Sequence, residues 1–310
     1  VKSYQFNDLE DKSFLEIIKN SDLIIDALLG TGIKGKLRGN IKKEITMINQ
    51  KLKRQPLTLA VDIPSGVIGI NGKIAGEALR ADYTATMAAP KRGLLLYPGR
   101  DYTGKLKVID IGIQSETIEK NGDGLKVFNK AEAVKLLPRR KNDGHKGSFG
   151  KLAVLAGSKG MTGAPLLSTK AALRSGSGLV YLLAADEIEA LTSVQLKEAV
   201  GVPLASKNGV ISAESLEQIM QFSENMDLLA AGPGLSRDPE VAAVIEGILK
   251  NLSLPLILDA DAINSIENLN LLKNYKGELI LTPHPVEMSE LTGISIEEIN
   301  NNRIEVARDF

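Results

Sequence analysis

The 310-residue sequence contains no cysteine and no tryptophan, and only 4% of its residues are aromatic. The absence of cysteine excludes disulfides and thiolate chemistry, and it fits a reducing compartment. The 38 basic and 38 acidic side chains cancel, so charge favours neither nucleic acid nor a membrane surface as a partner. No apolar run reaches the roughly 18 residues that a membrane span needs, and no signal peptide is visible. These absences predict a cytoplasmic protein with neither kind of partner.

The sequence has ample material for large hydrophobic cores, since 43% of its residues are hydrophobic and 25% are charged. Its length favours two domains. A broken, charged stretch separates two more regular regions, so we place the domains at residues 1–114 and 143–310, with a connecting segment at 115–142. The sequence starts in mid-pattern at Val1 and ends inside a helical pattern at Phe310, so we expect truncation at both ends.

The first domain contains a strand, a helix and a second strand. Residues 21–30 form an apolar run, a helix with one apolar face is expected over 41–52, and residues 57–66 form another apolar run. Such a crossover gives parallel strands whose carboxyl ends meet at one edge of the sheet, where ligands bind in open parallel sheets. Asp26 and Asp62 stand at or near these two strand ends.

A glycine-rich basic loop follows the first strand. Residues 30–39 read Gly-Thr-Gly-Ile-Lys-Gly-Lys-Leu-Arg-Gly. The glycines let the backbone approach a ligand closely, and the three cations favour a phosphate. The loop matches neither the P-loop pattern nor a regular dinucleotide-binding pattern. A flexible, solvated basic loop therefore remains an open alternative.

Two carboxylates beside this loop make a candidate site. Asp62 could transfer a proton, while Asp26 and the Ser65 hydroxyl could hold a hard cation through oxygen ligands. The alternative for each aspartate is a helix cap or a turn residue. Lys91 and Arg92 follow a further strand, expected over 81–90, and are expected to be solvated.

Strands and helices alternate regularly in the second domain, which predicts a mostly parallel sheet covered on both faces. Gly-rich or acidic turns follow its strands at residues 157–163, 232–236 and 259–264. Such turns gather along one edge of a parallel sheet, so we expect a binding edge for a polyphosphate or a dinucleotide. Asp259 and Asp261 could order a hydroxyl or a hydrated cation, or cap the next helix.

Two histidines stand in contrasting settings. His284 is bracketed by two prolines between a strand at 278–281 and a helix, which places it at the N-cap, where an anion is favoured. A structural histidine that only caps the helix is the alternative. His284 and Glu287 make a poor zinc site. His145 lies in a glycine-rich loop at 144–150, which either lines a pocket or makes a hairpin connection.

These motifs resemble those of one family. Residues 26–32 and 62–66, Asp-Ala-Leu-Leu-Gly-Thr-Gly and Asp-Ile-Pro-Ser-Gly, resemble the NAD(P)H-hydrate epimerase domain. Residues 144–147, 232–234, 259–264 and 282–288 resemble the ADP-dependent NAD(P)H-hydrate dehydratase domain. Both sets occur in the order found in the bifunctional NAD(P)H-hydrate repair enzymes. The resemblance implies an α/β fold with two three-layer α/β/α domains, a Rossmann-like epimerase part followed by a ribokinase-like dehydratase part.

The resemblance also implies a reaction, the repair of a nicotinamide cofactor that carries added water at C6 as two epimers. The first domain would interconvert the epimers of NADHX or NADPHX. The second would phosphorylate the hydroxyl of one epimer with ADP and eliminate phosphate to restore NAD(P)H. Asp62 would transfer the proton, and Asp26 and Ser65 would bind potassium. The implied substrate contacts are Gly30, Thr31, Gly32, Ile33, Lys34, Gly35, Lys36, Asp62, Gly234, His284, Pro285, Val286, Glu287, Met288, Ser289 and Glu290. Mg²⁺ is a further candidate ligand, and a homo-oligomer is expected.

Two family motifs are missing from the sequence. The epimerase's Asn-Asn-Gly-Gly-Asp-Gly loop and the dehydratase's Gly-Ser-Gly-Asp motif, which carries the catalytic base, do not occur in the 310 residues. If these residues were the whole molecule, we would expect neither activity. Two rivals therefore stay open, a ribokinase-like small-molecule kinase and a non-catalytic nucleotide-binding or protein-interaction module.

Overall fold

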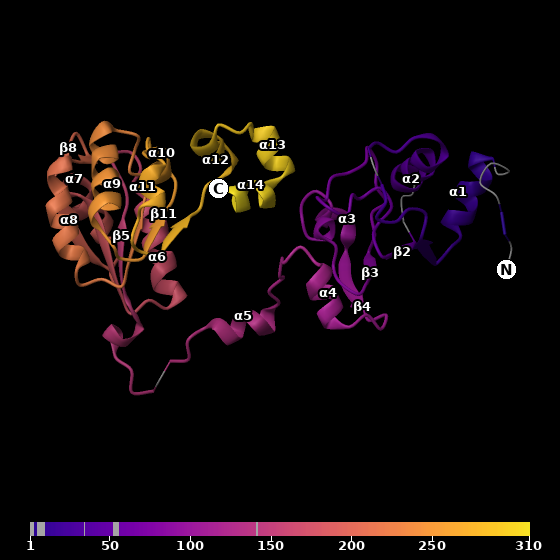
Figure 1. Ribbon diagram of the computed structural model, residues 1–310, viewed down its shortest axis with the longest axis horizontal. Coiled ribbons are helices and arrows are strands. Elements are labelled where there is room, and N and C mark those ends of the chain that lie inside the picture. Colours follow the sequence, from indigo (N-terminus) through magenta and orange to yellow (C-terminus); the bar gives the residue numbers. More distant parts are fainter. Residues whose placement is uncertain (1–2, 5–9, 34, 52–55, 141) are drawn as a thin grey trace. The chain divides into compact units, whose positions relative to one another are not determined.

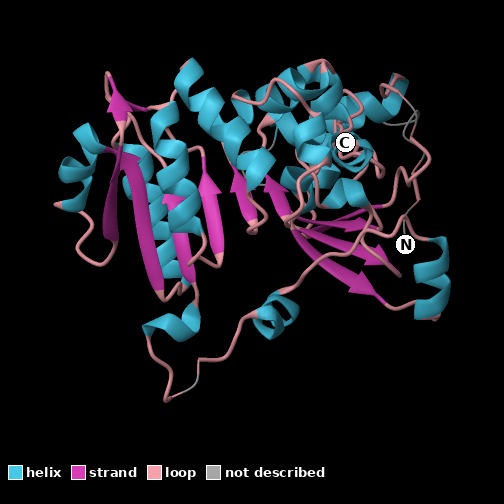
Figure 2. Cartoon of the chain, turned by 60° about the vertical axis from the view of Figure 1, so that its left-hand side comes forward, coloured by secondary structure: helices cyan, strands magenta, loops and turns pink. Residues whose placement is uncertain are grey.

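The computed structural model describes residues 3–4, 10–33, 35–51, 56–140 and 142–310. The chain divides into two compact units, Val1–Asn129 and Lys130–Phe310 (Figure 1). Each unit has its own β-sheet with helices packed on it (Figure 2). The mixed α/β class predicted from the sequence is confirmed. None of the described helices is long and apolar enough to cross a membrane.

The N-terminal unit is built on a four-stranded parallel sheet. Its strands are β1 (Leu23–Asp26), β2 (Leu57–Val61), β3 (Tyr83–Met87) and β4 (Lys105–Ile109), adjacent in that order. Its helices are α1 (Asp11–Lys19), α2 (Gly39–Lys51), α3 (Arg100–Thr103) and α4 (Ser115–Asn121). Since neighbouring strands are parallel and consecutive, the residues that follow β1, β2 and β3 meet at one edge, as predicted.

One face of this sheet is covered by apolar side chains and the other is open. Ile45 and Ile48 of α2 pack around Ile24 of β1, which points to the covered face. Leu23 and Ile25 alternate with Ile24 along the strand, and both are exposed. The described residues of this unit therefore show a sheet with one covered face. Leu52, which we expected in the helix over 41–52, lies outside the described residues.

The C-terminal unit has a six-stranded parallel sheet in the order β12-β11-β10-β5-β6-β7. Its strands are β5 (Lys151–Leu155), β6 (Leu179–Ala185), β7 (Val200–Leu204), β10 (Leu228–Ala231), β11 (Leu256–Leu258) and β12 (Leu279–Leu281). A short antiparallel pair, β8 (Ser206–Lys207) and β9 (Val210–Ile211), stands apart from this sheet. The mostly parallel sheet predicted for this part of the chain is confirmed.

The order of the strands determines which face of the sheet the helices of this unit cover. They are α5 (Lys130–Leu136), α6 (Gly163–Ser175), α7 (Asp186–Ser193), α8 (Leu216–Ser223), α9 (Pro239–Asn251), α10 (Asp261–Asn264), α11 (Asn270–Lys273), α12 (Pro285–Thr292), α13 (Ile296–Asn301) and α14 (Arg303–Asp309). The chain runs from β5 to β7 in one direction and then returns through β10 to β12 in the other. With right-handed crossovers, α6 and α7 cover one face and α8 and α9 the other. The direction reverses between β5 and β10, and ligands of open parallel sheets bind beside such a point.

The core of the C-terminal unit lies between this sheet and its helices. Helix α9 buries Val241, Val244, Ile245 and Ile248, a spacing that puts one apolar stripe on the sheet. Asp238 caps this helix, because its carboxylate accepts a hydrogen bond of 2.9 Å from the Glu240 N–H. The apolar stripe and the N-cap therefore point to the same helix, and the helix predicted over 239–250 is present.

Sequence patterns missed β7, which runs over Val200–Leu204. This strand contains Gly201 and Pro203, two residues that normally argue against a strand. It lies at the end of the strand order, and an edge strand tolerates a proline because one side needs no hydrogen-bond donor. The position of the strand in the sheet, which only the tertiary fold decides, explains the miss.

Candidate functional sites

Asp62 sits directly after β2, in the tight turn that we proposed as a proton-transfer site. Its backbone has φ 68°, a left-handed conformation that costs a non-glycine residue about 1 kcal/mol or more. Its N–H donates to the Ala85 carbonyl at 2.9 Å. Its carboxylate Oδ1 accepts hydrogen bonds from the Met87 N–H at 3.0 Å and the Thr86 hydroxyl at 3.2 Å. The end of β3 therefore holds the Asp62 carboxylate in place.

Lys91 completes this cluster, and the prediction that it is solvated is wrong. Its ammonium donates to Oδ1 of Asp62, to the Thr86 hydroxyl at 3.2 Å and to the Met87 carbonyl at 3.1 Å. Lys91 lies four residues beyond β3, whose carboxyl end neighbours that of β2. Arg92 is also poorly solvated, because its side chain is only 21% exposed and its Nε lies 3.4 Å from Asp123 Oδ2. The adjacency of β2 and β3 is what brings the Lys91 ammonium to Asp62.

The charge state of Asp62 follows from these contacts. Burial raises the pKa of the Asp62 carboxyl. Hydrogen bonds from Lys91, Met87 and Thr86, together with the charge of Lys91, lower it by more than burial raises it, so the pKa of Asp62 lies below its ordinary value. A depressed folded-state pKa contributes stability above the unfolded-state pKa, and that contribution is lost as pH falls through the folded-state value.

We therefore expect the free energy of unfolding of the N-terminal unit to fall below about pH 4. In the Asp62→Asn variant it should fall less over the same range. The amide cannot titrate, while asparagine tolerates the left-handed backbone as well as aspartate does. Urea unfolding of both proteins at about pH 7 and about pH 3 measures the difference. An equal loss in the two proteins would contradict the assignment of this dependence to Asp62.

Asp26 and Ser65 join the end of β1 to the turn after β2. Both are buried, with Asp26 only 2% exposed. The Asp26 carboxylate accepts from the Ser65 N–H at 2.7 Å and from the Ser65 hydroxyl at 2.6 Å. The Leu29 N–H donates to the Ser65 hydroxyl at 2.9 Å. The structure thus brings the predicted cation ligands together, as a set of hard oxygen atoms beside the basic loop.

The basic loop after β1 borders a hollow of about 530 Å³. The hollow is lined by Leu29, Ile33, Gly35, Lys36, Leu37, Arg38 and Ile41. Gly30, Thr31 and Gly32 are exposed, and Lys34 lies outside the described residues. A Cβ on Gly69 would lie 3.8 Å from Thr31 Cγ2 and 3.9 Å from Lys91 Cβ. Thr31 at the start of the loop and Lys91 therefore both flank Gly69.

In the C-terminal unit, the turns after β5, β10 and β11 contact one another. The Gly157 N–H donates to the Pro233 carbonyl at 3.0 Å, and the Gly232 N–H donates to the Leu155 carbonyl at 3.1 Å. Gly234 has φ 69°, and a Cβ there would lie 3.0 Å from Ala164 Cβ and 3.2 Å from Met161 Cβ. The glycine-rich turns therefore gather at the carboxyl edge of the sheet, as predicted, with Gly234 against the start of α6.

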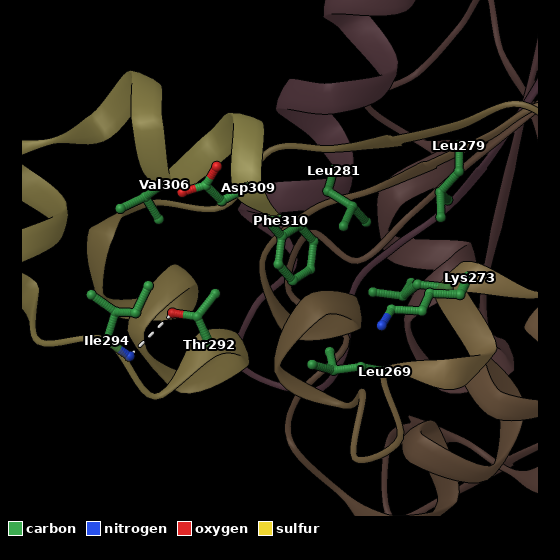
Figure 3. A pocket seen from close by; sticks show the side chains of 10 residues that line it. Leu269, Lys273, Leu279, Leu281, Thr292, Ile294, Val306, Asp309 and Phe310 are labelled. Carbon is green, nitrogen blue, oxygen red and sulfur yellow. Dashed lines mark hydrogen bonds between the residues drawn. The ribbon is translucent and has the colours of Figure 1, made fainter.

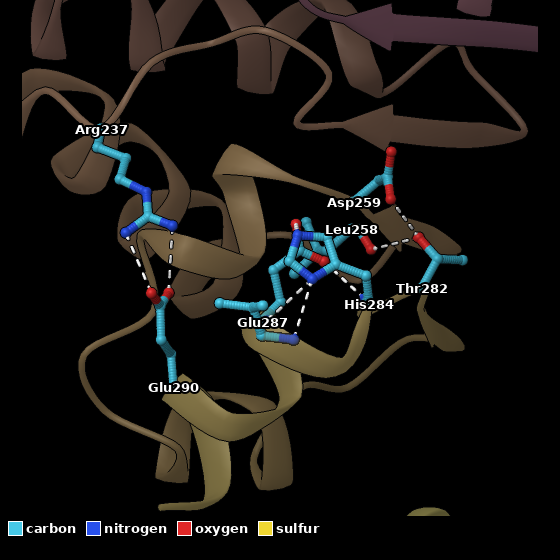
Figure 4. A network of polar contacts seen from close by, with 8 residues as sticks. Arg237, Leu258, Asp259, Thr282, His284, Glu287 and Glu290 are labelled. Carbon is cyan, nitrogen blue, oxygen red and sulfur yellow. Dashed lines mark hydrogen bonds and ion pairs between the residues drawn. The ribbon is translucent and has the colours of Figure 1, made fainter. Parts of the chain in front are cut away.

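Two aspartates tie this edge together, and Figure 4 shows the contact of one of them, Asp259, with Thr282. Asp259 accepts a hydrogen bond from the Thr282 hydroxyl at 2.7 Å, and Asp261 accepts one from the Ser236 N–H at 2.9 Å. Ser236 and Ala260 both have positive φ, 79° and 48°. The aspartates therefore fasten the turns after β10, β11 and β12 to each other, in addition to any role toward a ligand.

His284 caps α12, which is the structural role that the sequence left open. Its Nδ1 accepts from the N–H groups of Val286 at 3.1 Å and Glu287 at 3.3 Å. The Glu287 carboxylate accepts in turn from the His284 N–H at 2.8 Å, which completes a capping box. The His284 side chain is 57% exposed, with Nε2 3.0 Å from Glu287 Oε1. The imidazole therefore caps the helix with one nitrogen and stays accessible at the sheet edge.

Replacing His284 with alanine is expected to destabilise the C-terminal unit by about 1 kcal/mol, because two N–H groups of α12 lose their acceptor. His284→Asp supplies a normal capping acceptor and is expected to restore most of that loss. Urea unfolding measures both variants. A loss for His284→Asp as large as that for His284→Ala would contradict the capping role.

The remaining residues of α12 face either the open edge of the sheet or the helices α13 and α14. Glu290 forms a two-pronged ion pair with Arg237, at 3.3 and 3.2 Å, and so reaches the turn after β10 (Figure 4). Pro285 opens the helix, and Val286 beside it is exposed. Met288 is buried against Ile299 and Val306, and the Ser289 hydroxyl donates to the Ile294 carbonyl at 2.6 Å. The structure thus brings Glu290 and His284 to the open edge but turns Met288 and Ser289 toward α13 and α14.

Other candidates lie away from this edge. His145 accepts from the Gly147 N–H at 3.1 Å and caps a short 3₁₀ turn, Lys146–Phe149. A mostly apolar hollow of about 470 Å³ lies beside β12, lined by Leu269, Leu272, Lys273, Leu279, Leu281, Thr292, Ile294, Val306, Asp309 and Phe310 (Figure 3). None of the predicted site residues lines it. Within the described residues, no group of three or more His, Cys, Asp or Glu side chains could hold a metal ion.

Comparison with known proteins matches the two units to different family models. Residues 152–310 match the family described as NAD(P)H-hydrate dehydratase, and residues 2–93 match the YjeF-related protein N-terminus. A bifunctional NAD(P)H-hydrate repair enzyme of Moorella thermoacetica is 36% identical over 94% of this chain and 54% of its own length. The enzyme of that name from Thermofilum pendens is 37% identical over 93% of this chain and 54% of its own length. The chain spans about half the length of the curated relatives it matches.

A solved structure resembles the C-terminal unit. It is the ADP/ATP-dependent NAD(P)H-hydrate dehydratase of Bacillus subtilis, co-crystallised with ATP and Mg²⁺. The TM-score is 0.51 at 28% sequence identity, and the match covers 61% of this chain and 63% of that one. This similarity supports the α/β fold predicted for the dehydratase-like part.

Proposed function

Since this chain belongs to the NAD(P)H-hydrate dehydratase family, we propose that it acts in the repair of hydrated nicotinamide cofactors. The C-terminal unit dehydrates one epimer of NADHX or NADPHX at the expense of ADP. The N-terminal unit, whose residues match a second family, interconverts the two epimers. The observation that carries the proposal is that the family-like turns after β1 and β2, and those after β10, β11 and β12, gather at the carboxyl edge of their own sheet.

In the C-terminal unit, the substrate lies over the turns after β5 and β10, beside the reversal of strand order. Gly234 allows close approach of the backbone there, and His284 and Glu290 face the same edge. The hydroxyl of the hydrated ring takes a phosphoryl group from ADP, which leaves as AMP. Elimination of inorganic phosphate then restores the nicotinamide ring.

The nucleotide and Mg²⁺ of the Bacillus subtilis relative support an ADP and Mg²⁺ site in this unit. Mg²⁺ commonly binds through substrate phosphates and one or two carboxylates, with water as the remaining ligand. Such a site fits an edge with two aspartates, Asp259 and Asp261, each of which uses one carboxylate oxygen to hold a neighbouring turn. The ion would neutralise the phosphate charge during transfer.

In the N-terminal unit, Asp62 transfers the proton on which epimerisation depends. Asp26 and Ser65 hold potassium, because they place a carboxylate and a hydroxyl oxygen together in a buried position. The loop Gly30–Lys36 binds the cofactor phosphates. The cation-bearing hollow beside it supports that role. A cytoplasmic location and a homo-oligomer belong to the same proposal.

The test is incubation with ADP and a mixture of NADHX epimers of a protein that carries these 310 residues together with the two family motifs missing from them. We expect NADH absorbance to return with release of one inorganic phosphate for each ADP consumed. A stable phosphorylated alcohol without NADH would instead identify a small-molecule kinase. Binding of NADPHX without any product would identify a nucleotide-binding module.

A further inference from the structure

Lys91 connects two turns at the edge of the N-terminal sheet. Its ammonium contacts three oxygen atoms, one each from Asp62, Thr86 and the Met87 backbone. Its side chain is 23% exposed and that of Asp62 is 24% exposed, so the pair is largely withdrawn from solvent. We infer that Lys91 is a positioning residue that orients the Asp62 carboxylate for the epimerisation proposed above, on which this inference rests.

The hydrogen bonds to Asp62 all reach one oxygen. Lys91, Thr86 and the Met87 N–H donate to Oδ1, and no described group donates to Oδ2. A carboxylate held through one oxygen keeps the other available to accept a proton in a fixed direction. This asymmetry is what a proton-transferring group requires, because the base must lie within hydrogen-bond reach of the proton it removes.

The backbone on both sides of the pair is strained. Asp62 has φ 68°, and Ala88, three residues before Lys91, has φ 61°. Backbone strain of this kind persists only where surrounding contacts hold it, and it concentrates at functional sites. Here the Lys91 ammonium links the two strained turns directly, so it fixes the side chain of Asp62 relative to both.

Another ion pair in the same unit shows the contrast. Lys43 and Asp11 join α2 to α1, but their side chains are 52% and 48% exposed. Exposed pairs of this kind contribute little, typically below about 1 kcal/mol, and orient nothing that reacts. Lys43 therefore supplies a matched control for the removal of a lysine from an ion pair.

The position of Lys91 also favours a role toward the substrate site. Thr31 and Lys91 both lie beside Gly69, because a Cβ added to this glycine would be in van der Waals contact with both side chains. Thr31 belongs to the loop proposed to bind the cofactor phosphates. The Lys91 ammonium thus contacts the carboxylate while its Cβ flanks Gly69, as Thr31 does, and its charge lowers the pKa of Asp62.

The test compares Lys91→Met and Lys91→Arg with Lys43→Met in a protein that carries these 310 residues together with the two family motifs missing from them. Interconversion of the NADHX epimers gives kcat and KM, thermal unfolding gives stability, and side-chain NMR gives the pKa of Asp62. For Lys91→Met we expect kcat to fall at least about tenfold with KM nearly unchanged, and the pKa of Asp62 to rise. Lys91→Arg keeps the charge and is expected to retain most of kcat, while Lys43→Met behaves like the wild type.

Several outcomes would overturn the inference. A Lys91→Met variant with wild-type kcat, or one whose loss of rate is no larger than that of Lys43→Met, leaves Lys91 without a positioning role. Lys91→Gln, which keeps a donor but removes the charge, takes its place if Lys91→Met does not fold. A wild-type chain that does not accelerate interconversion contradicts the proposed function. In that case the titration of Asp62 tests the role of Lys91. A pKa of Asp62 that is the same in Lys91→Met as in the wild type refutes the inference.

Discussion

Replacing Asp62 with asparagine is expected to lower the rate of epimer interconversion by about 100-fold to 10,000-fold. Asparagine keeps the side-chain shape and tolerates the left-handed backbone, but its amide cannot take up a proton. Its oxygen can still accept the hydrogen bonds that reach Oδ1, so the turn after β2 stays in place. The measurement is the initial rate of conversion of one NADHX epimer into the other, with thermal unfolding as a check on folding.

The matched control for this variant is Asp110→Asn. Asp110 directly follows β4 in the same sheet, is exposed, and only accepts a turn hydrogen bond of 2.8 Å from the Gly112 N–H. We expect this variant to interconvert the epimers at the wild-type rate. If Asp62→Asn kept more than about a tenth of that rate, proton transfer by Asp62 would be refuted.

The second large effect is expected from Gly232→Ala, which should destabilise the C-terminal unit by more than about 4 kcal/mol. Gly232 has φ 134°, and a Cβ there would lie 1.7 Å from the Asp259 carbonyl oxygen. Neither the backbone conformation nor the contact can accommodate a side chain without moving the turns after β10 and β11 apart. Urea unfolding followed by circular dichroism measures the loss.

Gly160→Ala separates the two causes. Gly160 also has a positive φ, 86°, but a Cβ there meets nothing within 4 Å. We expect it to cost only about 1 kcal/mol, the price of a left-handed alanine. Similar losses of stability in the two variants would show that the turns after β10 and β11 do not pack as closely as the structure indicates.

Sequence patterns located the two sheet edges because local chemistry determines them. Parallel strands show as apolar runs, and the glycines and aspartates that follow them mark turns whatever the tertiary fold is. The predictions for Asp62 after β2, for Gly234 in the turn after β10 and for His284 at the N-cap of α12 depended on such local signals. Helix α9 was equally visible, since its apolar stripe and its proline lie within one segment.

Contacts between distant segments could not be predicted in this way. Lys91 looks like a solvated lysine beside a proline, and its burial depends on which strand neighbours β3. The pairing of Arg237 with Glu290 joins residues 53 positions apart. Met288 follows His284 on one helix, yet it faces the core formed with α13 and α14, which no short motif shows.

The sequence by itself determined the class of fold, the places where strands end, and the chemical types gathered there, because these depend on periodicity and on residues within a few positions of each other. The tertiary structure decided which of those residues meet. It joined Lys91 to Asp62, and Ser65 to Asp26, because parallel strands bring together turns far apart in the chain.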